Sequence, residues 1–108
     1  MSVTVISQWD SGMTAETYKK FTDAMKFSDS LPKGCEAHTA AIAEDGTFIV
    51  TDIWESAKAF ETFSSDTAPT LKTLDIKSPD KVSVMEIVAH AADAKSFRLG
   101  GHSFRLSR

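Results

Sequence analysis

A predicted β-hairpin between residues 35 and 54 is the feature that most constrains how this chain folds. Two runs rich in β-forming residues, 35–43 and 47–54, flank the pair Asp45-Gly46. An Asp-Gly pair in this position indicates a tight hairpin, because a type I′ turn needs positive φ angles at both central residues. The second run leads directly to Ser56, which predicts the N-cap of a helix. The sequence therefore predicts a strand–turn–strand–helix unit around which the other elements are placed.

The elements predicted on either side of the hairpin give the order β-α-β-β-α-β. Residues 3–9 are rich in β-branched side chains and predict the first strand, and Thr14 predicts the N-cap of a helix that ends at 31–34, Leu-Pro-Lys-Gly. The second helix is expected to break between residues 64 and 69, a polar stretch that ends in proline. Residues 81–90 predict the last strand. This order is that of a ferredoxin-like α+β fold, a four-stranded antiparallel sheet with two helices on one face.

The register of the hairpin decides which side chains share a face of the sheet. With a two-residue loop at the Asp-Gly pair, Thr39 lies opposite Asp52 and faces the same side as Trp54. The same register places His38 on the other side, so His38 and Asp52 are not expected to meet within one chain. Both faces of the hairpin are largely apolar, whereas a sheet with one face in water alternates apolar and polar residues. We therefore expect this chain's helices to cover one face and a second copy to cover the other, in a homodimer.

Composition and charge argue against several classes of protein. A chain of 108 residues with 42% apolar residues is expected to form one globular domain, and its net charge of −3 argues against a nucleic-acid partner. No apolar run approaches the roughly 20 residues of a membrane span, so we expect no membrane contact and a cytoplasmic protein. Cys35 is the only cysteine, and His90 and His102 show no ligand spacing with His38. We therefore expect no disulfide, no metal site and, without a glycine-rich phosphate loop, no cofactor.

The last sixteen residues differ in composition from the rest. Residues 1–92 hold eight lysines, no arginine and fourteen acidic residues, whereas all three arginines lie in residues 93–108. The tetrapeptide Ser-Phe-Arg-Leu occurs there twice, at 96–99 and 103–106. In extended form each copy puts Phe and Leu on one side and Arg on the other, which suits a short hairpin or a peptide that docks on a protein partner. We divide the chain into a domain at 1–92 and a basic C-terminal extension, and expect the extension to pack on the acidic body or its dimer mate.

Two titratable side chains are the candidate catalytic groups. His38 ordinarily has a pKa near neutrality, so it could act as a base toward a phenol or enol, or as a haem ligand; the alternative is a structural hydrogen bond at the sheet surface or dimer interface. Asp52 lies on a mostly apolar face, where a carboxylate must be paired or have a raised pKa. It therefore either orients a substrate or makes a structural hydrogen bond. Cys35, which opens a strand, is expected to be an inert small side chain.

The candidate pocket residues are aromatic side chains at the interface between helices and sheet, together with one hydroxyl beside Asp52. They are Trp9, Tyr18, Trp54, Phe60 and Thr39. Trp54 could stack on a planar substrate, and Tyr18 and Trp9 could line a cavity between the first helix and the sheet. Each of these aromatic residues has the alternative role of an ordinary core residue.

Taken together, these features resemble the dimeric α+β barrel proteins related to antibiotic-biosynthesis monooxygenases. The resemblance covers residues 3–90 and rests on the element order, on Gly-x-x-x-His at 34–38, and on Thr-Asp-Ile-Trp-Glu-Ser at 51–56. The pair Phe60 and Phe63 and a Pro-Thr-Leu segment late in the second helix add to it. The resemblance implies a homodimer whose two sheets close into a barrel, with a cavity between helices and sheet in each subunit. Members include cofactor-independent oxygenases acting on polycyclic phenols, haem-degrading enzymes and isomerases.

Three functions are open at this point. The first is a small cofactor-independent monooxygenase-like enzyme acting on an aromatic or polyketide-type substrate, with His38 as base, Asp52 orienting the substrate, and Trp54 and Tyr18 as walls. An electron-rich phenolate in a dry cavity can use O₂ directly, so this function needs no metal or flavin motif. The second is a non-catalytic homodimer that binds a small apolar or aromatic ligand, or a protein partner through its tail. The third is haem binding or degradation, for which His38 is the candidate axial ligand.

Overall fold

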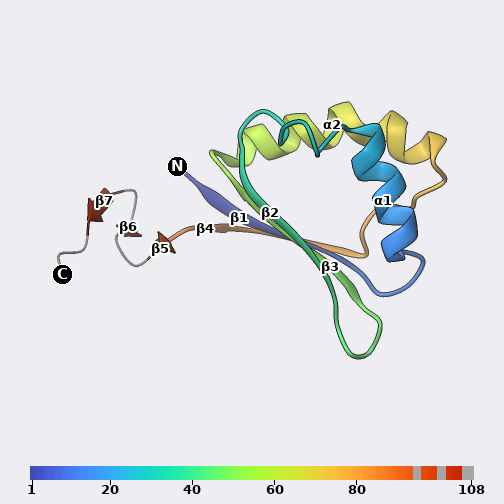
Figure 1. Ribbon diagram of the computed structural model, residues 1–108, viewed down its shortest axis with the longest axis horizontal. Coiled ribbons are helices and arrows are strands. Elements are labelled where there is room, and N and C mark those ends of the chain that lie inside the picture. Colours follow the sequence, from blue (N-terminus) through green and yellow to red (C-terminus); the bar gives the residue numbers. More distant parts are fainter. Residues whose placement is uncertain (94–95, 100–101, 106–108) are drawn as a thin grey trace.

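A four-stranded antiparallel sheet with two helices on one face forms the body of the protein (Figure 1). The computed structural model describes the backbone of residues 1–93, 96–99 and 102–105, and the side chains of residues 1–90. The strand order in the sheet is β2-β3-β1-β4. The elements are β1 (Val3–Trp9), α1 (Ala15–Ala24), β2 (Cys35–Ile42), β3 (Phe48–Trp54), α2 (Ala57–Thr73) and β4 (Lys81–Glu86). The predicted ferredoxin-like α+β fold is therefore confirmed.

Both helices begin at the residues that the sequence predicts as N-caps. The Thr14 hydroxyl oxygen accepts a hydrogen bond from the Thr17 N–H at 3.1 Å, and the Ser56 hydroxyl oxygen accepts one from the Ala59 N–H at 3.0 Å. Each cap satisfies a backbone donor that the first turn of a helix leaves without an intrahelical partner. These two caps set the residue at which each helix begins.

The end of α1 differs from the prediction, because the helix stops at Ala24 instead of continuing to 31–34. Lys26 adopts a left-handed conformation with φ of 57°. Its N–H donates to the Asp23 carbonyl at 3.1 Å, and the Phe27 N–H donates to the Thr22 carbonyl at 3.0 Å. These two bonds form a Schellman motif without the usual glycine. The motif turns Phe27 back onto Phe21, with ring centroids 5.8 Å apart, and so brings Phe27 into the space between helices and sheet.

The second helix is continuous through the stretch where a break was expected. Residues 57–73 form one helix with Pro69 inside it, so the predicted break at 64–69 is wrong. Thr67 is only 2% exposed, and its hydroxyl donates to the Phe63 carbonyl at 2.9 Å. Inward-facing side chains at helical spacing extend across the polar stretch, and their burial outweighs the one hydrogen bond that proline removes.

The hairpin between β2 and β3 has a three-residue loop instead of the expected two-residue loop. The Ala43 N–H donates to the Thr47 carbonyl, and the Gly46 N–H donates to the Ala43 carbonyl, both at 2.9 Å. Gly46 takes φ of 92°, a left-handed conformation that glycine adopts without steric cost. Three-residue hairpin loops that end in a left-handed glycine are the common alternative to the type I′ turn.

The longer loop shifts the register by one residue and reverses the faces predicted for β2. His38 lies opposite Asp52, and Thr39 lies opposite Thr51. Because side chains alternate along a strand, a slip of one residue moves every side chain of that strand to the other face. The predictions that Thr39 faces Asp52 and that His38 and Asp52 point to opposite faces are therefore wrong. Both His38 and Asp52 point toward the helices.

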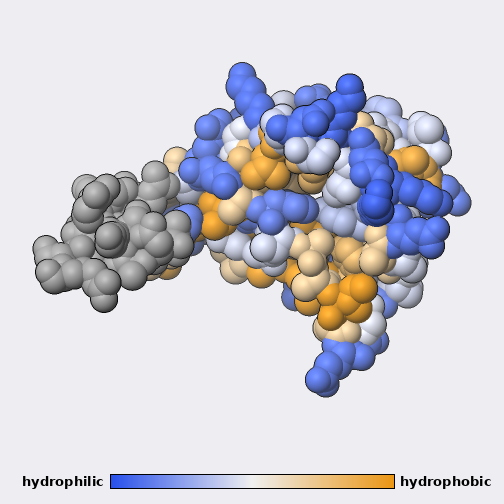
Figure 2. Space-filling model, in the orientation of Figure 1, coloured by the Kyte–Doolittle hydropathy of each residue, from blue (hydrophilic) through white to orange (hydrophobic). Residues whose placement is uncertain are grey.

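The core lies between the sheet and the helices. Every second residue of β1 and of β3 is buried there, with the set Val3, Val5, Ser7, Trp9, Phe48, Val50, Asp52 and Trp54. The residues between them, including Ile6, Ile49 and Ile53, are half-buried on the face that the helices leave open. Figure 2 shows one side of the molecule, on which apolar patches lie between polar side chains. Large exposed apolar side chains include Ile42, Val82, Val84, Met85 and Val88.

A second, three-stranded antiparallel sheet follows β4 along the chain (Figure 1). It consists of β5 (Ala89–Asp93), β6 (Ser96–Leu99) and β7 (His102–Arg105). The predicted strand at 81–90 is thus divided, because β4 ends at Glu86 and His90 belongs to β5. The two Ser-Phe-Arg-Leu copies contribute to paired strands, as expected for the hairpin alternative. The expected packing of the extension on the body or a dimer mate depends on side chains outside the described residues. Within the described part of the chain, no helix is long and apolar enough to cross a membrane.

Candidate functional site

A cavity of about 320 Å³ lies between the helices and the sheet. This volume is at the lower end of the range for ligand pockets, roughly 300–1,000 Å³. Its wall is largely apolar and includes seven aromatic residues, Trp9, Tyr18, Phe21, Phe27, Trp54, Phe60 and Phe63. The polar side chains that line it are His38 and Asp52 together with the hydroxyl residues Ser7, Ser64, Thr67 and Ser78. A lining of this kind favours a small, flat and largely apolar ligand with few polar groups.

The structure brings most of the predicted site residues to this cavity. The two candidate catalytic residues line it, as do the four aromatic residues that the sequence suggested. Thr39 does not line it, because the corrected register turns its side chain to the open face of the sheet. There the Thr39 hydroxyl donates to the Thr51 carbonyl at 3.5 Å, and the residue is exposed.

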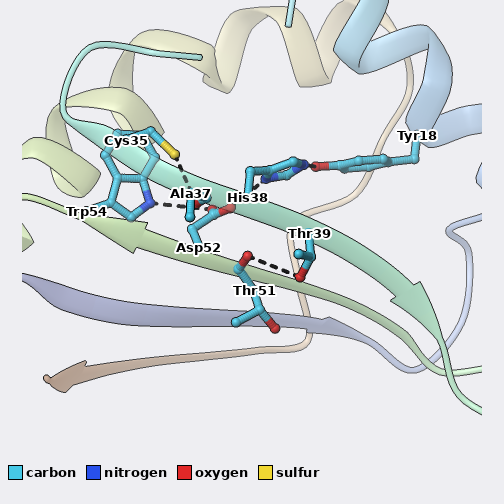
Figure 3. Close-up of polar contacts among 8 residues, drawn as sticks. All are labelled: Tyr18, Cys35, Ala37, His38, Thr39, Thr51, Asp52 and Trp54. Atoms are coloured by element: carbon cyan, nitrogen blue, oxygen red, sulfur yellow. Dashed lines mark hydrogen bonds and ion pairs between the residues drawn. The ribbon is translucent and has the colours of Figure 1, made fainter. Parts of the chain in front are cut away.

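Tyr18, His38 and Asp52 form a chain of hydrogen bonds along one side of the cavity (Figure 3). Tyr18 Oη lies 2.8 Å from His38 Nε2, and His38 Nδ1 lies 2.5 Å from Asp52 Oδ1. Trp54 Nε1 donates to the other oxygen of Asp52 at 3.4 Å. The three groups come from α1, β2 and β3. These hydrogen bonds form only because the hairpin register places His38 beside Asp52.

For an ionised Asp52 and a neutral His38, the hydrogen-bonding capacity of each group decides where the protons in these hydrogen bonds lie. An ionised Asp52 can only accept, so His38 Nδ1 carries a proton and donates it to the carboxylate. In a neutral imidazole Nε2 is then the acceptor, and the Tyr18 hydroxyl donates to it. Asp52 thus holds His38 in the tautomer whose unprotonated nitrogen faces Tyr18. This is the arrangement of a general base with an orienting carboxylate.

Burial shapes the chemistry of the tyrosine. Tyr18 is 9% exposed, and burial raises the pKa of its hydroxyl far above the ordinary value of 10.0, with the negative charge of Asp52 adding to the effect. Phe48 packs on the Tyr18 ring, and Phe27 stands edge-on to His38 with ring centroids 5.3 Å apart. Tyr18 therefore stays protonated at neutral pH and is held in place by aromatic neighbours.

Cys35 also lines the cavity, beside the start of β2. Its thiol donates to the Ala37 carbonyl at 3.3 Å. Burial, followed by the charge of Asp52, raises the pKa of this thiol to about 11. A thiol with that pKa is protonated at neutral pH and is a poor nucleophile, in keeping with the inert role expected from the sequence.

Alkylation of Cys35 by iodoacetamide at pH 8 is expected to be about 100-fold slower in the folded protein than in urea, because the thiolate fraction falls tenfold per unit of pKa. Mass spectrometry of timed samples gives the rate. A steric barrier alone would also slow the reaction, so the pH dependence is the deciding control. The rate should rise about tenfold per pH unit up to about pH 10. A plateau near pH 9 would contradict the raised pKa.

Phe27 and Ser7 are among the lining residues that sequence reasoning missed. Phe27 reaches the cavity through the Schellman motif after α1, and no glycine marks that motif in the sequence. Ser7 had a readable signal, because it occupies the buried register of the alternating run Val3, Val5, Ser7 and Trp9. Ser7 lines the cavity from β1.

The described residues contain no group of three or more His, Cys, Asp and Glu side chains that could hold a metal ion. For haem, His38 would have to supply an axial nitrogen, yet Nδ1 is bonded to Asp52 and Nε2 to Tyr18. Ligation through Nε2 would require Tyr18 to move away. The donor arrangement thus fits proton transfer better than axial ligation.

Comparison with known proteins shows similarity of fold only, without significant similarity of sequence. The sequence matches no protein-family model and no curated protein. Among solved structures it is similar to SnoaB, a cofactor-independent oxygenase from Streptomyces nogalater, with a TM-score of 0.59 and 19% identity over 80% of this chain and 92% of that one. It is also similar to Rv0793 from Mycobacterium tuberculosis, with a TM-score of 0.57 and 16% identity over 86% of this chain and 100% of that one. A third similar structure is that of a proposed antibiotic-biosynthesis monooxygenase from Deinococcus radiodurans, with a TM-score of 0.51 and 16% identity over 81% of this chain and 92% of that one. The fold is that of antibiotic-biosynthesis-monooxygenase-like proteins.

Proposed function

We propose that this protein is a small monooxygenase-like enzyme that needs no cofactor and acts on a hydroxylated aromatic substrate. The observation that carries the proposal is the hydrogen-bonded chain of Tyr18, His38 and Asp52 beside an aromatic-lined cavity. The fold shared with a cofactor-independent oxygenase supports it. His38 is the base and Asp52 orients it. Trp54, which is 1% exposed, supports the wall by packing against Phe60 and Phe63 and by its hydrogen bond to Asp52.

The first step is removal of the substrate's hydroxyl proton. Both Tyr18 and His38 line the cavity, and the Tyr18 hydroxyl occupies His38 Nε2. The substrate therefore gives its proton to Tyr18 Oη while Tyr18 gives its own proton to His38 Nε2. The raised pKa of Tyr18 makes a lasting tyrosinate unfavourable, and the negative charge therefore stays on the substrate. The resulting imidazolium is paired with the Asp52 carboxylate, which stabilises it in an apolar cavity.

The second step uses the electron-rich phenolate as the reductant of O₂. A ring carbon of the substrate forms a C–O bond to give a peroxide, the O–O bond breaks, and the carbon loses its hydrogen. One oxygen atom stays on the ring as a quinone carbonyl. The other leaves as water, which takes one proton back from His38 and the other from the ring carbon. The substrate supplies all four electrons. A dry aromatic cavity favours this step by excluding water from the reactive phenolate.

Oxygen uptake by the purified protein with a panel of phenols and naphthols tests the proposal. The expected result is uptake of one O₂ per naphthoquinone formed, above the rate of the substrate alone in buffer. Uptake no faster than in buffer across the panel would contradict the proposal.

A second candidate function is binding of such a ligand without turnover. It is favoured by the hydrogen bond from Tyr18, which occupies His38 Nε2 in the free protein. Tight binding of a naphthol with no oxygen uptake would select this function over the enzyme.

The proposal includes a homodimer formed through the open face of the sheet. Ile6, Ile49 and Ile53 are half-buried on that face, and no element of the described chain covers it. Burying them against a second copy stabilises the dimer by roughly 25 cal/mol per Å² of apolar surface removed from water. Pairing of the two faces is the simplest closed, two-fold arrangement.

The variant Ile6→Lys is expected to convert the dimer to a monomer, because the interface would bury an unpaired charge. Light scattering coupled to size exclusion gives the mass. The matched control is Ile42→Lys, which is 56% exposed and lies on the helix side of β2, and should remain dimeric. A monomeric wild-type protein would exclude this interface.

A further inference from the structure

The cavity opens to solvent between α2 and β4. A residue that lines a cavity and is also exposed marks the boundary between the cavity and bulk solvent. The exposed lining residues come from the middle of α2, the loop before β4 and the start of β4, and they are Ser64, Ala68, Ser78 and Val82. The other lining residues are buried or half-buried. In the described part of the chain, the mouth of the cavity therefore lies at the β4 edge of the sheet.

The side chains at this mouth are small. Except for Val82 they are serine or alanine. Val82 is 44% exposed and lies opposite Ser7, so it is on the side of the sheet that the helices cover. Small side chains on both rims leave a passage between a helix and a strand. The sizes of Ala68 on α2 and Val82 on β4 therefore set the width of that passage.

His38 lies at the opposite edge of the sheet from the mouth. The edge strands in the order β2-β3-β1-β4 are β2, which carries His38, and β4. The row of paired residues that starts at His38 runs through Asp52 and Val5 to Val84, two residues after Val82. With strands about 4.8 Å apart and about 3.4 Å per residue, the Cα atoms of His38 and Val82 are roughly 16 Å apart. The cavity therefore extends across the sheet from His38 to the mouth.

The end of the cavity at His38 is closed by aromatic rings. Tyr18 and Phe21 are buried, and the Tyr18 ring stacks on His38 with centroids 5.9 Å apart. Phe27 stands edge-on to His38. Adding volume against a densely packed wall is unfavourable, because the surrounding side chains must leave their preferred rotamers. A ligand whose hydroxyl is held at Tyr18 thus has little space beside that hydroxyl and open space toward the mouth.

We propose that the ligand enters between α2 and β4 with its hydroxyl first, and that Ala68 and Val82 select what its trailing end can be. The cavity rejects substituents beside the ionised hydroxyl. It accepts them at the opposite end of the ring system, where they extend into the mouth. This inference rests on the proposed function, because it gives the orientation of the ligand whose proton passes to Tyr18.

Calorimetric titration of the wild-type protein under nitrogen tests this orientation with three ligands: 2-naphthol, 6-ethyl-2-naphthol and 3-ethyl-2-naphthol. The ethyl group lies at the far end of the 6-ethyl compound, which is expected to bind at least as tightly as 2-naphthol. It lies beside the hydroxyl in the 3-ethyl compound, which should bind about 10- to 100-fold more weakly because it overpacks the aromatic wall. Equal affinities for the two ethyl compounds would overturn the inference.

The variant Ala68→Trp tests the position of the mouth. A large ring on the rim should weaken binding of 6-ethyl-2-naphthol about 10-fold or more, because it fills the space that the ethyl group needs. It should slow the association and the dissociation of 2-naphthol together, as measured by stopped flow, and leave the Kd within about threefold of wild type, since a narrower passage hinders entry and exit alike. Val82→Trp narrows the mouth from the other rim and should act in the same direction.

The matched control is Thr62→Trp, since Thr62 is exposed on the same helix and does not line the cavity. It should bind all three ligands as wild type does, and circular dichroism verifies that each variant is folded. Wild-type rates and affinities in both Ala68→Trp and Val82→Trp, or an equal effect of Thr62→Trp, would overturn the inference. Selection between the two ethyl compounds without oxygen uptake would support the inference and remove the enzymatic function. No binding of 2-naphthol to wild-type protein would overturn both.

Discussion

The variant His38→Gln is expected to consume O₂ with a naphthol about 10²- to 10⁴-fold more slowly than wild-type protein, the usual contribution of a positioned general base. Glutamine can still bond to both Tyr18 and Asp52, so the cavity keeps its shape, but the imidazole nitrogen that is the proposed base is lost. Oxygen-electrode rates at saturating naphthol measure the effect on kcat. The main effect should be on kcat, because ligand stacking on the aromatic walls is unchanged.

The same substitution at another histidine is the control for this variant. His90 lies in β5, in the second sheet, so His90→Gln should retain the wild-type rate. Circular dichroism of His38→Gln is measured first, to verify that the variant is folded at the assay temperature. Turnover by folded His38→Gln within twofold of wild type would remove His38 from the chemistry.

The variant Gly34→Ala is expected to destabilise the protein by about 2–4 kcal/mol, which combines the cost of a left-handed alanine with that of overpacking. Gly34 has φ of 87°, and a Cβ atom there would lie 2.8 Å from the Cβ of Ala59 on α2. Its carbonyl also accepts from the Glu55 N–H at 2.8 Å, so the backbone has little freedom to move. Thermal unfolding should show a Tm lower by roughly 10–25 °C for a domain of this size.

The control for Gly34→Ala separates backbone strain from the steric contact. Gly46 in the hairpin loop has a similar φ of 92°, but a Cβ added there meets nothing within 4 Å. Gly46→Ala should therefore cost only about 1–2 kcal/mol. Equal losses in the two variants would show that the approach of α2 to Gly34 is looser than the structure describes.

The order of elements could be predicted from the sequence because local signals agree with the fold. Thr14 and Ser56 cap the helices as expected, and the alternating run in β1 matches its burial. Signals of this kind act over a few residues and depend little on distant contacts. The two helix errors arose where tertiary packing dominated: Lys26 takes a left-handed conformation at the end of α1, and α2 continues through Pro69.

The site was harder to predict, because it depends on a register that one residue changes. His38 and Asp52 were each recognised as candidates, but a two-residue loop placed them on opposite faces. In the structure a left-handed Gly46 closes a three-residue loop. The register that results places His38 Nδ1 2.5 Å from Asp52 Oδ1. The contact from Tyr18 adds a helix whose position over the sheet no local pattern specifies.

The ionisation state of a bound naphthol tests the central claim most directly. In the proposed mechanism the proton passes from the substrate through Tyr18 to His38 before any reaction with O₂. Absorbance of 2-naphthol bound under nitrogen at pH 7 distinguishes the neutral molecule from the naphtholate. The account predicts the naphtholate spectrum in wild-type protein and the neutral spectrum in His38→Gln at equal ligand occupancy. A neutral bound naphthol in wild-type protein, or a naphtholate in both proteins, would contradict it.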